Sequence, residues 1–172
     1  AVNGNITMTT SSGSGLRSGD NMVIRTTGTG GTAGNIAIAT AGDVWFCNYT
    51  GCAAGANTTI STIDGTITIS AVNFSNGTSN TAVLGGASTT GAITLNVDTF
   101  TMNSSFSLQT TGVATIRPNT ASRTMGLGTG AGSLSVANAL LGQLNAGSYV
   151  FGSTSAGDLT IAATNDFGNK NV

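Results

Sequence analysis

Gly65-Thr66-Ile67-Thr68-Ile69-Ser70 is the stretch of the chain that decides the fold. A glycine comes first, and Ile then alternates with a small hydroxylated residue. Alternation with a period of two places the Ile side chains on one face of an extended strand and the hydroxyls on the other. The β-branched residues Ile and Thr also suit the pleated surface of a sheet. The stretch therefore predicts a half-buried β-strand that begins just after a glycine turn.

The same pattern recurs along the chain. Each copy has a glycine followed by an alternating apolar stretch, and these glycines are Gly4, Gly34, Gly65, Gly91, Gly112, Gly132 and Gly157. Successive glycines lie 20 to 31 residues apart. A hairpin loop of about two to five residues is too short to explain such steps, and no helical pattern fills them. Further strand-like stretches do fill them, such as Val44–Phe46 and Ser148–Phe151.

A coil of short strands joined by Gly, Ser, Thr and Asn turns fits this step. We therefore predict an all-β fold, a right-handed parallel β-helix of about six to seven coils around a narrow aliphatic core. The alternative is an antiparallel β-sandwich, which also has many short strands and for which Asn76-Gly77 would serve as a hairpin dipeptide. We expect one β-helix domain over residues 1–172, with surface excursions near 47–62 and 75–90.

Composition excludes several classes of function. Charged residues make up 6 % of the chain, the net charge is −1 and there is no His, which excludes His-based metal centres, Ser–His triads and an electrostatic nucleic-acid surface. No apolar run approaches the roughly 18 residues of a membrane helix. The Asp residues are scattered and suit turns and caps. We expect no enzymatic activity, no cofactor or metal, no nucleic-acid partner and no membrane span.

The two cysteines lie close together, at Cys47 and Cys52. The Asn, Thr and Gly between them make a tight loop plausible, and the composition is typical of a secreted protein. We therefore predict a local disulfide, with two reduced thiols as the alternative. Closing so short a loop constrains the unfolded chain less than a long one would.

Small residues occupy the outward slot of successive alternating stretches. They form a candidate outward ladder of Thr7, Thr68, Thr94, Thr115, Ser135 and Thr160, with Ala37 in the second stretch. Stacked hydroxyls hydrogen-bond well across strands, so a ladder suits a solvated sheet face or packing against a second rod. It could equally bind glycans or ice, although the uneven steps between the glycines argue against a strictly regular plane.

Four stretches of the C-terminal half resemble the repeats of filamentous-haemagglutinin-like bacterial surface proteins. They are Arg123-Thr-Met-Gly-Leu-Gly-Thr129, Gly132-Ser-Leu-Ser-Val-Ala-Asn-Ala-Leu-Leu-Gly-Gln-Leu144, Ala146-Gly-Ser-Tyr-Val-Phe-Gly-Ser153 and Ala156-Gly-Asp-Leu-Thr-Ile-Ala162. The resemblance covers residues 110–165. It implies a secreted right-handed β-helix on the bacterial surface, with a short Leu-rich helical turn, serving adhesion, contact or matrix building. The Asn-Pro-Asn motif of the family's secretion domain is absent, since Pro118 follows Arg117.

These observations together predict a non-enzymatic structural or adhesive protein at the bacterial cell surface. A β-helix has open strand edges at its ends, and exposed edges pair with other chains. Low charge offers little repulsion against such pairing. We therefore expect a homo-oligomer or filament built by end-to-end or lateral strand contacts, or a segment of a long adhesin rod. The alternative is a binding module for a glycan, a cell surface or ice.

Overall fold

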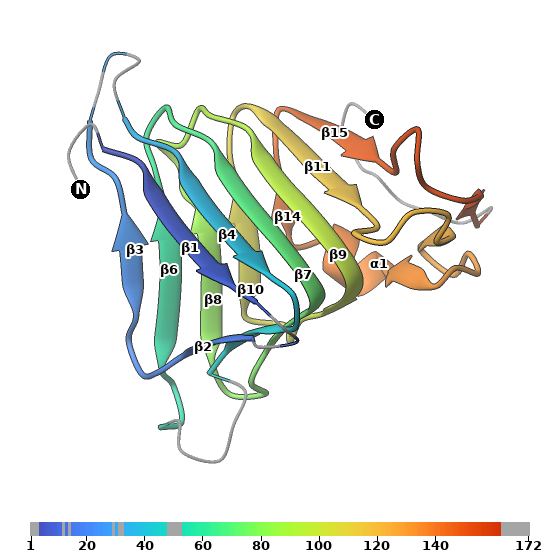
Figure 1. Cartoon of the computed structure of the whole chain (residues 1–172), viewed down its shortest axis with the longest axis horizontal. Helices are drawn as coiled ribbons and strands as arrows, with labels where there is room; N and C mark the ends of the chain where they lie inside the picture. The colour runs from blue at the N-terminus through green and yellow to red at the C-terminus, as the bar shows by residue number, and fades with distance from the viewer. Residues whose placement is uncertain are drawn as a thin grey trace.

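The chain folds into sheets of parallel strands stacked along one axis (Figure 1). The computed structural model describes residues 4–11, 13, 15–28, 30, 33–47 and 53–162. Among these residues, every strand pairing is parallel. The fold is therefore all-β and consistent with a β-solenoid, and the antiparallel sandwich is wrong.

The largest sheet, which we call sheet A, carries the glycine-initiated stretches. Its strand order is β1-β4-β7-β9-β11-β15. The strands are β1 (Ile6–Thr10), β4 (Ile36–Thr40), β7 (Ile67–Asn76), β9 (Ile93–Thr101), β11 (Val113–Arg117) and β15 (Ser148–Phe151). Two short strands extend it, because β2 (Leu16–Ser18) pairs with β5 (Val44–Phe46), and β5 pairs with the second half of β7.

A second and a third sheet complete the coils. Sheet B has the order β14-β10-β8-β6-β3, and its strands are β3 (Val23–Arg25), β6 (Asn57–Ser61), β8 (Thr81–Gly85), β10 (Phe106–Gln109) and β14 (Leu144–Asn145). Sheet C has the order β13-β12-β16, formed by β12 (Met125–Leu127), β13 (Leu134–Val136) and β16 (Leu159–Ile161). A four-residue helix, α1 (Asn138–Leu141), lies between β13 and β14.

A column of glycines explains why each coil turns from sheet B into sheet A at the same place. A Cβ built on Gly34 would lie 2.0 Å from the carbonyl oxygen of Gly4, and one on Gly65 would lie 2.4 Å from that of Gly34. On Gly91 the distance to the Gly65 oxygen would be 1.8 Å. Real Cβ contacts are essentially never below 3.0 Å, so the coils can stack this closely because the side chain is absent.

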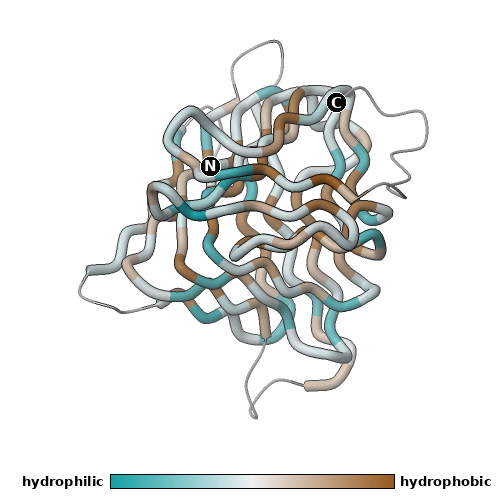
Figure 2. Tube along the Cα trace, turned by 90° about the vertical axis from the view of Figure 1, so that its right-hand side faces the viewer, coloured by the Kyte–Doolittle hydropathy of each residue, from teal (hydrophilic) through white to brown (hydrophobic). Residues whose placement is uncertain are grey.

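The core is a narrow column of side chains that point inward from successive coils. The register pairs Ile6 with Ile36, Ile36 with Ile67 and Ile67 with Ile93, and the last three are fully buried. Figure 2 shows hydrophobic residues alternating with hydrophilic and intermediate ones along the strands. The period-two pattern of the sequence therefore becomes a continuous aliphatic row, whose burial drives folding.

Four phenylalanines cluster in one part of the core. Phe74 stacks on Phe100 with ring centroids 5.7 Å apart and meets Phe46 edge-on at 5.0 Å. Phe106 of sheet B packs edge-on against both Phe74 and Phe100. Such aromatic pairs contribute about 0.5–1.5 kcal/mol each beyond the area they bury. The cluster ties sheet B to the second halves of β7 and β9.

The predicted excursions near 47–62 and 75–90 are largely wrong. The first contains β6 and the second contains β8, and the two strands pair with each other in sheet B. Their Ile60 and Leu84 are fully buried. The Gly, Asn and Ser residues around these short strands hid them, although Thr58 and Ile60 in β6 and Ala82 and Leu84 in β8 alternate with less buried residues. Residues 48–52 of the first segment lie outside the described part of the chain.

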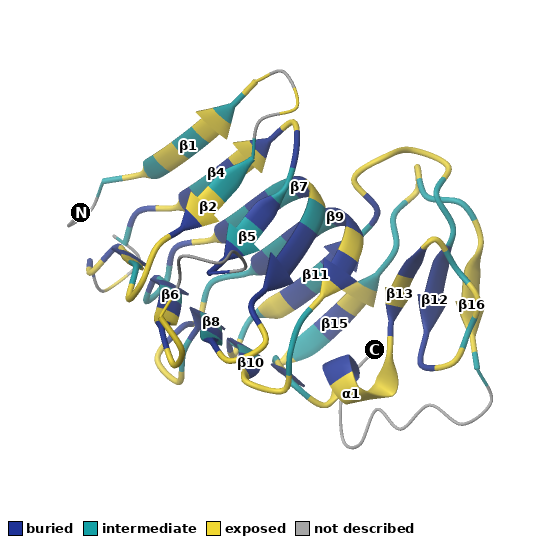
Figure 3. Cartoon of the chain, turned by 90° about the horizontal axis from the view of Figure 1, so that it is seen from below, coloured by how far each residue is buried: buried dark blue, intermediate teal, exposed yellow. Residues whose placement is uncertain are grey.

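The C-terminal end departs from the simple coil because sheet C receives an extra strand. After β12 the chain returns within a few residues as β13, which runs parallel to β12 and lies against β9. β16 then pairs with the other side of β12. In Figure 3 these three strands form a separate group beside the end of sheet A. Among the described residues, the structure has no helix long and apolar enough to span a membrane.

Candidate functional site

Four of the six predicted ladder residues form one row on sheet A, together with Ala37 of the second stretch. Pairing places Thr7 beside Ala37, Ala37 beside Thr68, Thr68 beside Thr94 and Thr94 beside Thr115. Thr7 is exposed and the other four are half-buried. Neighbouring strands lie about 4.8 Å apart, so the row presents hydroxyl or methyl groups at regular intervals along the axis.

Ser135 and Thr160 do not belong to that row, and the prediction that they do is wrong. Both pair with Gly126 of β12 in sheet C, whereas the residue beside Thr115 is Val150 of β15, which is 47 % exposed. The period-two pattern indicates which residues face outward but not which strand lies alongside. Here β13 inserts into sheet C before the chain returns to sheet A.

A second outward row runs beside the first and is more polar toward β11. It consists of Thr9, Ala39, Ser70, Asn96 and Arg117 in register. The Asn96 amide donates to the Ser70 hydroxyl at 2.8 Å, and the Arg117 Nε donates to the Asn96 Oδ1 at 2.5 Å. The outer face of sheet A therefore changes from small and hydroxylated near β1 to hydrogen-bonded and cationic near β11.

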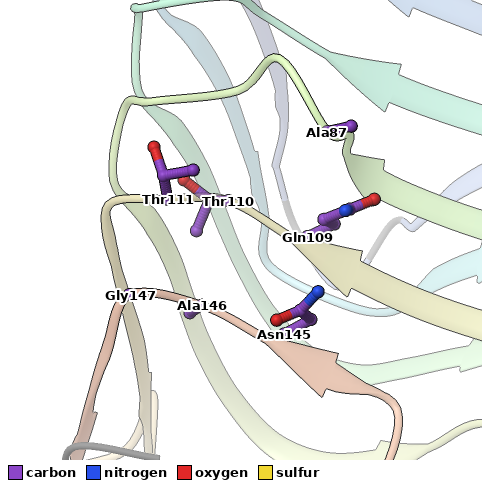
Figure 4. Close-up of a pocket in the computed structure, with 7 residues that line it drawn as sticks. All are labelled: Ala87, Gln109, Thr110, Thr111, Asn145, Ala146 and Gly147. Carbon is purple, nitrogen blue, oxygen red and sulfur yellow. The ribbon is translucent and has the colours of Figure 1, made fainter.

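Two hollows lie where sheet B turns into sheet A. The one in Figure 4 has a volume of about 210 Å³ and is lined by Ala87, Gln109, Thr110, Thr111, Asn145, Ala146 and Gly147. The other, of about 310 Å³, is lined by residues 25–27, 61–63 and 85–89. Ala87 borders both hollows, so they lie on either side of the turn at residues 86–89.

The outward column of sheet B leads along these hollows. Arg25 pairs with Ser61, Gly85 pairs with Gln109, and Gln109 pairs with Asn145. Gly85 interrupts the column because it has a φ of +79°, and a Cβ there would lie 2.1 Å from the Gln109 carbonyl oxygen. The chain leaves the sheet at this point to form the turn between the hollows.

Buried threonines donate hydrogen bonds to backbone carbonyls where sheet B turns into sheet A. Thr26 donates from its hydroxyl to the Gly34 carbonyl at 2.7 Å and lies 2.8 Å from the Thr62 hydroxyl. In the next two coils, Thr89 donates to the Thr62 carbonyl at 2.6 Å, and Thr110 donates to the Gly91 carbonyl at 2.7 Å. These threonines satisfy backbone carbonyls next to the glycine column, so their role is structural. Sequence analysis did not single them out, although each lies in a Thr-rich turn before such a glycine.

The N-terminal end of sheet A presents a strand edge. β1 pairs with β4 on one side, and no other described strand pairs with it. Ile6 donates its N–H to the Asn35 carbonyl at 2.8 Å. Because alternate residues of a parallel strand bond to opposite sides, the N–H groups of Thr7 and Thr9 face away from β4. Ile6 and Met8 remain only partly buried against the core.

Of the two cysteines predicted to form a disulfide, only Cys47 lies in the described part of the chain. Cys47 is 2 % exposed, and its backbone N–H donates to the Ser18 hydroxyl at 3.0 Å. Cys52 lies outside the described residues, so the predicted pairing stays a prediction. Nearby, the Arg17 guanidinium lies 4.2 Å from the centre of the Trp45 ring, a cation–π contact on the outer face.

Titratable groups are scattered over the described part of the chain, which holds no group of three or more His, Cys, Asp or Glu residues able to bind a metal ion. Asp98 is buried and accepts from both the N–H and the hydroxyl of Thr120, at 2.8 and 2.6 Å, while Arg123 lies 3.6 Å away. Burial raises the pKa of Tyr149, and a hydrogen bond from the Ala146 N–H partly offsets this. These groups fasten neighbouring segments to one another.

No protein-family model, curated protein or solved structure matches the chain. The function must therefore be argued from the outer face of sheet A, the hollows beside sheet B and the open strand edge.

Proposed function

We propose that the protein is a non-enzymatic structural or adhesive element of the bacterial cell surface, either a subunit of a filament or a segment of an adhesin rod. The parallel solenoid architecture supports this role, because stacked coils build length from short repeated units. The resemblance of residues 110–165 to filamentous-haemagglutinin-like repeats supports the surface location. A disulfide between Cys47 and Cys52 would suit the same oxidising environment.

We also propose a right-handed coil of about six to seven turns. The six strands along the main path of sheet A support the number of turns. Parallel crossover connections in proteins are right-handed in about 98 % of cases, which supports the hand.

The open edge of β1 is the observation that carries the proposal. The N–H groups of Thr7 and Thr9 point away from β4, and exposed strand edges pair readily with other chains. The half-buried Ile6 and Met8 stand at the same end, so a further coil would extend both the hydrogen-bonded ladder and the aliphatic column. In the proposed assembly a second copy of the chain supplies that coil. Within a longer rod, a neighbouring coil of the same chain would occupy the same position.

Sedimentation velocity and negative-stain microscopy over a range of protein concentrations test this proposal. We expect the wild-type chain to form assemblies that grow with concentration. Thr7→Pro removes one N–H from the open edge and no bond to β4, so we expect it to reduce assembly. Thr7→Val keeps the N–H and is the matched control. Monodisperse single-chain particles at every concentration would refute assembly through this edge.

The row from Thr7 to Thr115 favours a second candidate function, binding of a glycan or ice by the outer face of sheet A. Its regular spacing supports this, whereas Ala37 and Val150 interrupt the hydroxyls. Thermal hysteresis and a glycan array test it. A surface-binding role predicts a signal in one of them that Thr68→Val and Thr94→Val together abolish. Absence of both signals leaves only the structural role.

A further inference from the structure

Two side-chain amides on neighbouring coils of sheet B make no hydrogen bond within the described part of the chain. Gln109 ends β10, Asn145 ends β14, and the two residues are register partners. In Figure 4 their side chains extend from adjacent strands along one side of the hollow. Neighbouring parallel strands lie about 4.8 Å apart, so the two side chains lie next to each other at the edge of the hollow.

Several other asparagine side chains of the fold serve its backbone ladders. Asn5 Oδ1 accepts from the N–H of Asn35 at 2.9 Å, and Asn35 Oδ1 accepts from the N–H of Thr66 at 2.8 Å. By contrast, within the described part of the chain no hydrogen bond engages the side-chain amide of Gln109 or Asn145. Each amide therefore offers two donors and one acceptor oxygen to an outside group.

The lining of this hollow narrows the chemistry of what those amides could bind. No charged side chain lines it, so nothing there favours a phosphate or a carboxylate. Ala87 and Ala146 supply small apolar surfaces beside the amides. A ligand that suits this surface is uncharged, carries adjacent donor and acceptor groups and has an apolar face. Vicinal hydroxyls on a sugar ring have these properties.

The size of the hollow favours one unit of a chain over an enclosed small molecule. Its volume of about 210 Å³ is below the roughly 300–1,000 Å³ of ordinary small-molecule pockets. The second hollow, with Ser61 and Arg25 in its lining, begins on the other side of Ala87. A linear ligand along the solenoid axis could therefore contact the outward column of sheet B beyond the first hollow.

We propose that Gln109 and Asn145 form a subsite for a neutral glycan chain, with the sugar hydroxyls bonded to the two amides and the chain directed along sheet B. This subsite differs from the Thr row on sheet A and is independent of the open edge of β1. It gives the proposed rod an adhesive surface on a second face.

Titration of the ¹⁵N-labelled protein with maltohexaose, cellohexaose and mannohexaose, followed by two-dimensional NMR, tests this proposal. The Thr7→Pro variant serves as the parent protein, so that the result does not depend on assembly. We expect at least one oligosaccharide, at up to about 10 mM, to shift the side-chain amide signals of Gln109 and Asn145. Replacing both residues by Ala should weaken binding at least about tenfold, since two hydrogen-bonding groups are lost.

Ser107→Ala is the matched control, because Ser107 lies on the same strand as Gln109 outside the hollow. It should leave glycan affinity unchanged, and circular dichroism should show all variants folded. The proposal is overturned if none of the three oligosaccharides shifts these signals, or if the double Ala variant binds as tightly as its parent. Shifts produced by an uncharged extended peptide, but by none of the sugars, would likewise assign the site to another ligand.

Discussion

Adding one methyl group to the glycine column should strongly destabilise the protein, and Gly91→Ala is the sharpest test. The new Cβ would lie 1.8 Å from the Gly65 carbonyl oxygen, whereas ordinary contact begins at 3.4 Å. The two coils would have to separate by about 1.6 Å, a third of the roughly 4.8 Å strand spacing. This separation would also stretch the neighbouring hydrogen bond from the Ile67 N–H to the Ala92 carbonyl oxygen, which is 2.9 Å long.

Overpacking of a close contact costs about 1–3 kcal/mol. Here the obstacle is backbone that cannot rotate away, so we expect a loss of about 3 kcal/mol in the free energy of unfolding. For a chain of this length each kcal/mol lowers the Tm by roughly 2–4 °C, so the Tm should fall by about 6–12 °C. Guanidinium unfolding followed by circular dichroism should show a lower midpoint at an unchanged m value.

Gly86→Ala is the matched control, because a Cβ on Gly86 would meet nothing within 4 Å. This variant should unfold at the wild-type midpoint or be more stable by up to about 1 kcal/mol, since Ala restricts the unfolded chain. If Gly91→Ala and Gly86→Ala unfold alike, the glycine column is not a steric requirement, and the account of how the coils stack is wrong.

Three further predictions concern the groups that fasten segments together. Tyr149→Phe should cost about 1–2 kcal/mol in chemical unfolding, because the Tyr149 hydroxyl accepts from the Ala146 N–H at 2.7 Å and donates to the Leu144 carbonyl at 2.9 Å; an unchanged midpoint would contradict these bonds. Burial raises the Tyr149 pKa in the folded state, so the stability that this residue contributes should be present below about pH 10 and fall as the pH rises beyond it. Unfolding curves at increasing alkaline pH should show this fall for the wild type and a smaller one for Tyr149→Phe. Asp98→Ala should cost about 2 kcal/mol by thermal unfolding, since it leaves the Thr120 N–H and hydroxyl without their buried acceptor, whereas removing the exposed charge of Asp158 by Asp158→Ala should change the Tm little.

The strands and their faces could be predicted from the sequence because both are local properties. Alternation of Ile with Thr or Ser fixes which side chains point inward, and the long steps between glycines exclude hairpins. These two facts were enough to predict parallel stacked strands and the row from Thr7 to Thr115. The same reasoning failed within residues 47–62 and 75–90, where segments rich in turn residues contain the strands β6 and β8.

The sequence pattern does not show which glycine follows Gly112 in the glycine column, and Gly147 is the example. It too precedes an alternating stretch, Ser148–Phe151, and a Cβ on it would lie 2.1 Å from the Thr111 carbonyl oxygen. It is therefore the true successor of Gly112 in the glycine column. Gly132 fitted the same pattern equally well in the sequence, yet the strand after it joins sheet C. Local alternation does not distinguish the two, because the choice depends on which backbone lies alongside.

The sequence by itself determined that this chain would form parallel strands with an aliphatic inside and a small, weakly charged outside, since residue type and period act within a few neighbouring residues. Only the tertiary structure decided which strands lie side by side. It separated Ser135 and Thr160 from the outward row and brought Gln109 beside Asn145, 36 positions further along the chain. The register between distant coils depends on coil length and on backbone contact, and both are set only when the whole chain has folded.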